Sequence, residues 1–228
     1  MLIVAGLIVL LVVIFAPQFW TQYVFKKYSK ELDAFPGTGG ELAEHLINKF
    51  ELSDVKVEQL ESDDNHYDPE QKTIRLSPQV YAEKSLTSVV IAAHEVGHAI
   101  QHQSAYRPLY LRWRMARVVA ISEKIAAVML VAFPFAAILT KLPLIGGLML
   151  FCGIMILFLP VMFHLITLPV ELDASFNRAL PILEHGQYLP KSAIPIARKI
   201  LMAAAFTYFA ASLASVLNFY RWLVFLRR

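Results

Sequence analysis

The sequence predicts an α-helical multi-pass membrane protein that carries a small α+β domain. The first reason is composition: 57% of the 228 residues are hydrophobic and only 17% are charged. A typical soluble domain is about 45–50% apolar and about 25% charged. The second reason is distribution, because uncharged runs lie on both sides of a stretch of ordinary soluble composition between Lys26 and Arg117. Runs of about 20 apolar residues are long enough to cross a bilayer.

Composition also excludes several classes of protein. Because Cys152 is the single cysteine, a disulfide scaffold and a cysteine-rich zinc finger are both excluded. The formal net charge of +3 is too small to indicate nucleic-acid binding. In a membrane protein, a mild excess of Lys and Arg indicates orientation instead.

The N-terminal run predicts a membrane anchor over residues 1–25. This segment has no charged side chain, and Trp20 and Tyr23 precede Lys26 and Lys27. An apolar core followed by aromatic and then basic residues is typical of the end of a membrane span. A cleaved signal peptide is the alternative. It would need basic residues before the run and a small-x-small site after it.

Residues 26–117 are expected to form the soluble domain. Its predicted elements are, in order, a helix capped by Thr38 and Glu41, a strand at 55–60, a strand–turn–strand unit at 65–77, and a helix that begins at Ser77 and Pro78. An apolar helix is then expected over residues 85–103.

That last helix contains His94-Glu95-Val96-Gly97-His98, an H-E-x-x-H sequence. Residues four apart share a helix face, so His94 and His98 can bind one metal ion. Glu95 is turned by about 100° and is expected to be the catalytic general base. Two imidazoles suit Zn²⁺, and a catalytic site needs one more protein ligand and an open position. The alternative is a pair of hydrogen-bonded core histidines.

Four membrane spans are expected, near residues 2–20, 118–140, 142–168 and 199–220. The apolar part at 125–139 could instead be a buried soluble helix, and the fourth span could lie along or re-enter the membrane. The predicted organisation is a 1–25 anchor, a 26–117 domain, a 118–168 transmembrane hairpin, a 169–198 helix and loop, and a 199–228 helix with a basic tail at Arg227 and Arg228.

The third ligand has to come from elsewhere in the chain. His102 lies two turns beyond His94, about 12 Å along the helix, which is too far to share a metal. His164 falls inside a predicted span and is expected to pack there. Glu171 follows the predicted hairpin, and two crossings return the chain to the side on which it started. Glu171 can therefore meet the two histidines, although a carboxylate at this boundary could simply face water.

These residues resemble the YugP-type neutral zinc metallopeptidases and, more distantly, the HtpX-like gluzincins. The resemblance covers nearly the whole chain and includes the N-terminal anchor, His66-Tyr67-Asp68-Pro69, Ala92–Gln101 and Glu171-Leu172-Asp173-Ala174-Ser175. It implies a zincin-type metalloprotease domain with one Zn²⁺ per chain, bound by His94, His98 and Glu171. Ser175 stands where gluzincins have an Asp that orients a ligand histidine, and Asp173 is nearly opposite Glu171 around a helix.

The expected activity is peptide-bond hydrolysis by a metal-activated water, with Glu95 moving the proton. Candidates for stabilising the oxyanion are His66, Tyr67 and Arg178. The resemblance also implies that the strand at Thr73–Ser77 pairs with an extended substrate. The alternatives are a zinc hydrolase acting on a non-peptide bond and a non-catalytic membrane scaffold or transporter that retains a metal.

The expected partners are a membrane-associated protein or peptide substrate and the lipid bilayer, without nucleic acid. Basic residues concentrate on the expected active-site side, at Lys26, Lys27, Lys30, Arg107, Arg112, Arg114 and Arg117. By the positive-inside rule, the active site should be cytoplasmic in a multi-pass cell-membrane protein.

Overall fold

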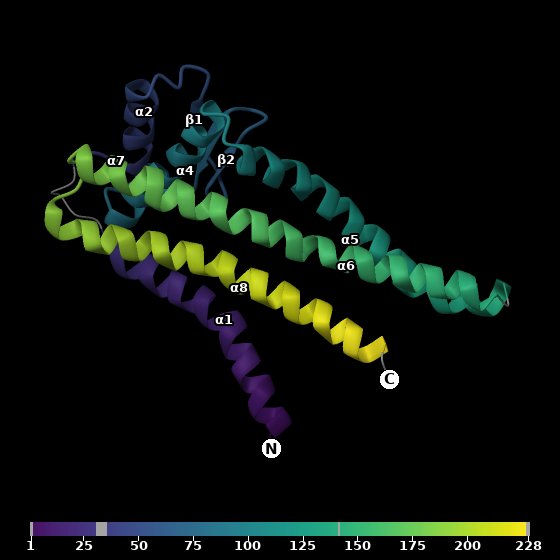
Figure 1. Ribbon diagram of the computed structural model, residues 1–228. Helices are drawn as coiled ribbons and strands as arrows, with labels where there is room; N and C mark the ends of the chain where they lie inside the picture. The colour runs from purple at the N-terminus through teal and green to yellow at the C-terminus, as the bar shows by residue number, and fades with distance from the viewer. Residues whose placement is uncertain (1, 31–35, 141, 227–228) are drawn as a thin grey trace.

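The computed structural model describes residues 2–30, 36–140 and 142–226. It has a head of short elements at one end of several long helices (Figure 1). The helices are α1 (Leu2–Tyr28), α2 (Gly39–Lys49), α3 (Pro78–Ala82), α4 (Leu86–Gln103), α5 (Arg107–Thr140), α6 (Pro143–Leu172), η1 (Asp173–Ala179), α7 (Leu180–His185), η2 (Lys191–Ala193) and α8 (Ile194–Leu226). The basic tail predicted at Arg227 and Arg228 lies outside the described residues.

The head follows the local patterns of the sequence. Thr38 and Glu41 form the predicted capping box at the start of α2, and the Ser77 side chain caps α3. The strands are β1 (Lys56–Gln59), β2 (His66–Asp68) and β3 (Thr73–Leu76). The protein is therefore mostly helical with a small three-stranded sheet, as expected for a helical chain with a small α+β domain.

The order of the sheet corrects one prediction. The order is β1-β3-β2, with β3 parallel to β1 and antiparallel to β2. β3 is the strand that was expected to bind substrate, but both of its edges are already paired. β2 is an edge strand. The prediction that the strand at Thr73–Ser77 pairs with substrate is therefore wrong. β1 occupies one edge of β3, and β2 occupies the other.

Helix α4 is the centre of the head. Its residues Val90, Ala92, Ala93 and Val96 are fully buried, and α2, α3 and η1 pack around it. A hydrogen bond from Thr87 Oγ1 to the Phe25 carbonyl oxygen (3.1 Å) connects α4 to α1. These contacts hold the H-E-x-x-H helix among the short elements of the head and against α1.

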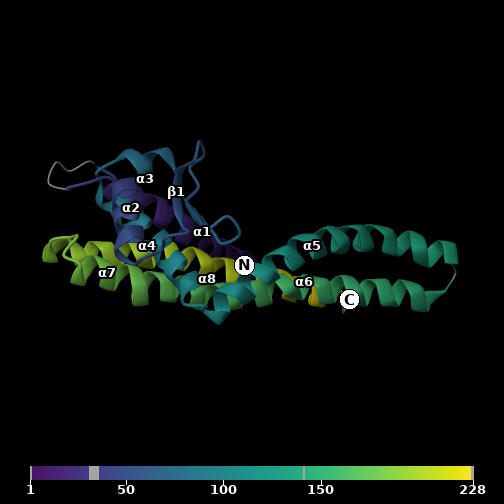
Figure 2. The same ribbon diagram turned by 90° about the horizontal axis from the view of Figure 1, so that it is seen from above.

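The long helices extend away from the head. α5 and α6 form a hairpin that projects from it, and α8 runs beside α6 and α1 (Figures 1 and 2). The spans predicted at 2–20, 118–140, 142–168 and 199–220 coincide with α1, α5, α6 and α8. Within the described residues, Phe158–His185 and Lys191–Leu217 are long and apolar enough to cross a membrane. Insertion of all four helices stays a prediction.

The chain does not stop at the end of α6 but continues as the π-helical segment η1 and then α7. The Leu180 amide donates to the Ser175 carbonyl oxygen, five residues back. Such wide turns are frequent at functional sites. Here the wide turn begins two residues after Glu171 and packs on α4.

Candidate metal centre

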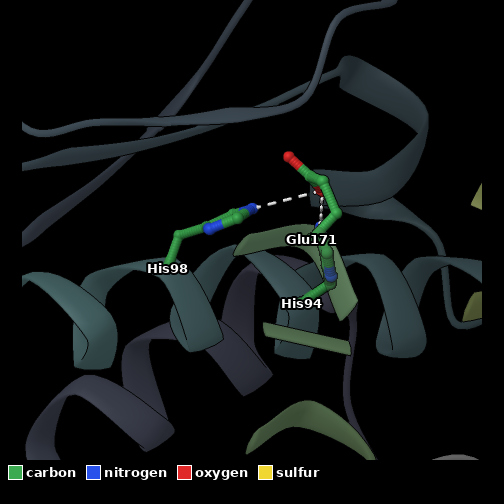
Figure 3. A group of neighbouring side chains, drawn as sticks. All are labelled: His94, His98 and Glu171. Atoms are coloured by element: carbon green, nitrogen blue, oxygen red, sulfur yellow. Dashed lines mark hydrogen bonds and ion pairs between the residues drawn. The ribbon is translucent and has the colours of Figure 1, made fainter. Parts of the chain in front are cut away.

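Three potential metal ligands from distant parts of the chain meet at one point (Figure 3). His94 and His98 project from successive turns of α4, and Glu171 lies near the C-terminal end of α6. Glu171 Oε2 is 3.2 Å from His94 Nε2 and 3.6 Å from His98 Nε2. The structure thus brings together the three residues proposed as ligands. That they bind zinc remains a prediction.

The spacing of these atoms fits a tetrahedral zinc site. Zinc binds imidazole nitrogen and carboxylate oxygen at about 2.0–2.2 Å, so two ligand atoms at the tetrahedral angle are about 3.3–3.6 Å apart. The measured separations of 3.2 and 3.6 Å are close to this range. Two histidines and one glutamate form a donor set that leaves a fourth position open for water or substrate. These residues could therefore hold a zinc ion.

Glu95 is 5% exposed. Together with His94, His98 and Glu171 it lines a cavity of about 240 Å³. The other lining residues are Asn65, His66, Tyr67, Pro69, Leu109, Arg112, Trp113, Ala116, Phe163 and Tyr208. Burial is the main reason that the pKa of the Glu95 carboxyl rises to about 7. A carboxyl group in this position can accept a proton and return it.

Each potential ligand has a polar partner behind it. Ser175 Oγ lies 3.1 Å from His94 Nδ1, and Gln101 Oε1 lies 2.9 Å from His98 Nδ1. Arg112 Nη1 forms an ion pair of 2.7 Å with Glu171 Oε1. Such partners fix the ring orientation of ligand histidines and hold ligand carboxylates in place.

Asp173 does not join the three ligands, but it does contact the site. Its Oδ2 accepts a hydrogen bond of 2.8 Å from Gln101 Nε2. In the structure, Asp173 reaches His98 through the side chain of Gln101.

The candidates for oxyanion stabilisation have different positions. His66 and Tyr67 line the cavity, whereas Arg178 does not and instead donates to Asp173 Oδ2 at 2.8 Å. Its position beside Asp173 does not favour Arg178 for that role, which stays a prediction for all three candidates. The Tyr67 hydroxyl is engaged with His102 Nδ1 at 2.7 Å. His102 thus supports Tyr67 and lies outside the group of ligands.

The polar residues of the cavity that sequence reasoning missed include Arg112 on α5 and Tyr208 on α8. Arg112 was considered only as one of several basic residues that indicate orientation. Neither residue belongs to a local motif, so only the packing of α5 and α8 around α6 reveals them. An ionisable residue close to a predicted span was the available signal for Arg112.

Gly97 allows α4 and η1 to approach each other closely. A Cβ atom at this position would lie 2.8 Å from the Ala174 carbonyl oxygen. Since Ala174 lies between the residues that contact Gln101 and His94, this approach positions both partners.

Comparison with known proteins decides the family. A family model described as "Putative neutral zinc metallopeptidase" matches residues 3–227. The chain belongs to this family. A relative from Bacillus subtilis (strain 168), "Putative membrane protease YugP", is 37% identical over 211 residues, which cover 90% of this chain and 90% of the relative. No solved structure matches the chain.

Membership of the family confirms the resemblance to the YugP-type metallopeptidases. The family description implies zinc, and the three residues that could hold a metal provide a donor set suited to it. The description of the relative adds membrane association for that protein.

Proposed function

We propose that this protein is a membrane-embedded zinc endopeptidase. One observation carries the proposal: two histidines and a glutamate converge on a cavity that also contains a buried glutamate on the same helix as the histidines. A purely structural metal site has no use for the carboxyl group of Glu95 beside it. The zinc peptidase family supports the same conclusion.

His94, His98 and Glu171 would hold one zinc ion per chain. When bound, zinc supplies a Lewis acid that polarises the scissile carbonyl and activates a water molecule. Glu95 accepts the proton of the attacking water and then delivers it to the leaving amine nitrogen. Enclosure of the Glu95 carboxyl limits its exchange of protons with bulk water, so the proton stays available for the second step.

The remaining lining of the cavity suits an extended peptide. The β2 edge strand contributes His66 and Tyr67 to the wall, and an unpaired strand edge can bind the backbone of an extended segment. Leu109, Trp113 and Phe163 form an apolar part of the wall, which would accept a hydrophobic side chain. Donors for the oxyanion are available from Tyr208 and His66.

We also propose that the long helices lie in the membrane. The α5–α6 hairpin exposes apolar side chains along its length, including Val128, Val131, Phe135, Ile138, Leu139, Leu144 and Leu148. Exposed apolar surface of this extent fits lipid better than water. We place the metalloprotease domain at residues 26–117, the membrane helices at 1–25, 118–168 and 199–228, and the third-ligand segment at 169–198. The excess of basic residues around the head supports the further proposal that the active site faces the cytoplasm.

The test compares cells that produce the wild type, Glu95→Gln or Glu44→Gln. Removing the general base should lower cleavage by about 10²–10⁴-fold, while zinc content of the purified protein stays near that of the wild type. The measurement is the set of new protein N-termini in the cells, together with metal analysis. Glu44 is an exposed residue of α2, so its substitution should change neither result.

Identical N-termini in wild-type and Glu95→Gln cells would contradict the endopeptidase proposal. A difference confined to lipids or small metabolites would instead favour a zinc hydrolase that acts on a non-peptide bond.

A further inference from the structure

Gln101 lies one turn beyond His98 on α4 and is fully buried. Its amide makes three hydrogen bonds with other side-chain or backbone groups. Gln101 Nε2 lies 2.9 Å from the Val170 carbonyl oxygen and 2.8 Å from Asp173 Oδ2. On the other side, Gln101 Oε1 lies 2.9 Å from His98 Nδ1. The amide therefore bridges a potential metal ligand and the segment that follows Glu171.

The chemistry of these partners leaves one orientation for the amide. A backbone carbonyl and a carboxylate are both acceptors, so the NH₂ group of Gln101 has to face Val170 and Asp173. Its carbonyl oxygen then faces His98. Because that oxygen can only accept, His98 Nδ1 has to carry the proton and donate. In a neutral ring, Nε2 is then the unprotonated nitrogen, and this is the atom that faces Glu171 Oε2.

Asp173 is itself held in place as an acceptor. Arg178 Nε donates to its Oδ2 at 2.8 Å, and Asn177 Nδ2 donates to its Oδ1 at 3.0 Å. The guanidinium of Arg178 also lies over the Tyr106 ring. Both carboxylate oxygens of Asp173 therefore already accept hydrogen bonds from neighbouring side chains, so the group that Gln101 turns towards Oδ2 has to be its NH₂ group. The orientation of the amide is thereby fixed from the far side.

We infer that Gln101 and Asp173 are positioning residues that set the tautomer of His98 for metal binding. This inference rests on the proposed zinc site. Asp173 acts through Gln101 and takes over the task that a carboxylate in direct contact with the histidine performs elsewhere. His94 differs, because its Nδ1 faces the Ser175 hydroxyl, which can donate or accept and so imposes no tautomer.

The experiment measures the zinc affinity of the purified full-length protein by competition with a chromogenic chelator. Gln101→Glu is nearly isosteric, but it removes the donor that Val170 and Asp173 require and sets two carboxylates against each other, so it should weaken zinc binding by about 10–100-fold. Asp173→Asn alone can keep an oxygen towards Gln101 and Arg178, so it should weaken zinc binding less. The double variant should recover at least half of the logarithmic loss of Gln101→Glu, because the carboxylate at position 101 accepts from His98 and the amide at position 173 can donate to it.

Gln103→Glu is the matched control. Gln103 is an exposed glutamine of the same helix, so its substitution should leave zinc affinity unchanged. Thermal unfolding of the metal-free proteins checks that each variant is folded. A purely structural role would lower the melting temperature without the mutual rescue in zinc affinity.

Unchanged zinc affinity in Gln101→Glu would overturn the inference, and so would a double variant that binds zinc no better than Gln101→Glu does. A failure of the proposed function looks different. In that case, the wild type itself would bind no zinc, or His98→Ala would bind it as well as the wild type.

Discussion

Glu171 presents its two carboxylate oxygens to different partners. Oε2 faces the two histidines and Oε1 faces Arg112. Only 2% of the Glu171 side chain is exposed, and a buried carboxylate is costly unless a positive group compensates for its charge. Arg112 provides that group at all times, and a bound metal ion would provide a second one.

Replacing Arg112 should therefore destabilise the metal-free protein more than the zinc-loaded protein. We predict that Arg112→Met costs up to about 3–5 kcal/mol of unfolding free energy without metal, the usual loss when one partner of a buried ion pair is removed. Excess zinc should reduce this loss, because the ion takes over the charge compensation. The measurement is thermal unfolding in detergent, with a chelator and with zinc.

Arg114→Met is the control, since Arg114 is an exposed arginine on the same helix. It should have little effect in either condition. An equal loss of stability for Arg112→Met with and without zinc would show that Arg112 does not compensate for the charge of the ligand.

Part of the site follows from local sequence and part does not. The spacing of His94, Glu95 and His98 on a helix is sufficient to predict their convergence. Glu171 needs an argument about crossings and a family resemblance, because it lies far along the chain. For Arg112 the sequence offers only its closeness to a predicted span, since its place depends on how α5 packs against α6.

At the scale of elements, the close contact of α4 with η1 determines whether the site can form. Gly97→Ala would place a Cβ atom 2.8 Å from the Ala174 carbonyl oxygen. Backbone cannot yield as a flexible side chain can, so the two elements would have to separate. We predict a loss of about 1–3 kcal/mol in stability and at least a tenfold loss in zinc affinity, measured by thermal unfolding and chelator competition.

Gly147→Ala is the matched control for this substitution. A Cβ atom at Gly147 would meet no atom within 4 Å, and alanine favours helix by about 1 kcal/mol over glycine. The account of the contact is wrong if Gly97→Ala binds zinc as tightly as Gly147→Ala does.

Local rules also explain which elements were predictable. The capping box at Thr38 and Glu41 and the cap at Ser77 depend on side chains a few residues apart, so the sequence shows them directly. The parallel pairing of β1 with β3 joins segments separated by β2, and no local pattern encodes it. The substrate-binding edge was therefore assigned to β3 rather than to β2.

At the scale of the whole molecule, the proposed orientation predicts which side of the membrane Lys72 occupies. Lys72 is on the surface of the head. In a Cys152→Ala background, Lys72→Cys should resist a membrane-impermeant thiol reagent in intact cells and react after permeabilisation. The physical reason is the basic residues around the head, which favour the cytoplasmic side. Labelling of this cysteine from outside intact cells would show that the proposed orientation is the wrong way round.

The head and the long helices depend on each other for the proposed site. The histidines belong to the head, whereas Glu171, Arg112 and Tyr208 belong to helices that extend from it. The central claim is that His94, His98 and Glu171 bind one zinc ion across this junction.

Metal analysis combined with zinc X-ray absorption on the purified protein tests this claim most directly. We predict about one zinc per chain, bound to two imidazole nitrogens and carboxylate oxygen at about 2.0–2.2 Å, and loss of most of that zinc in Glu171→Ala. A sulfur ligand, which only Cys152 or a methionine could supply, or full zinc occupancy in Glu171→Ala would contradict the account.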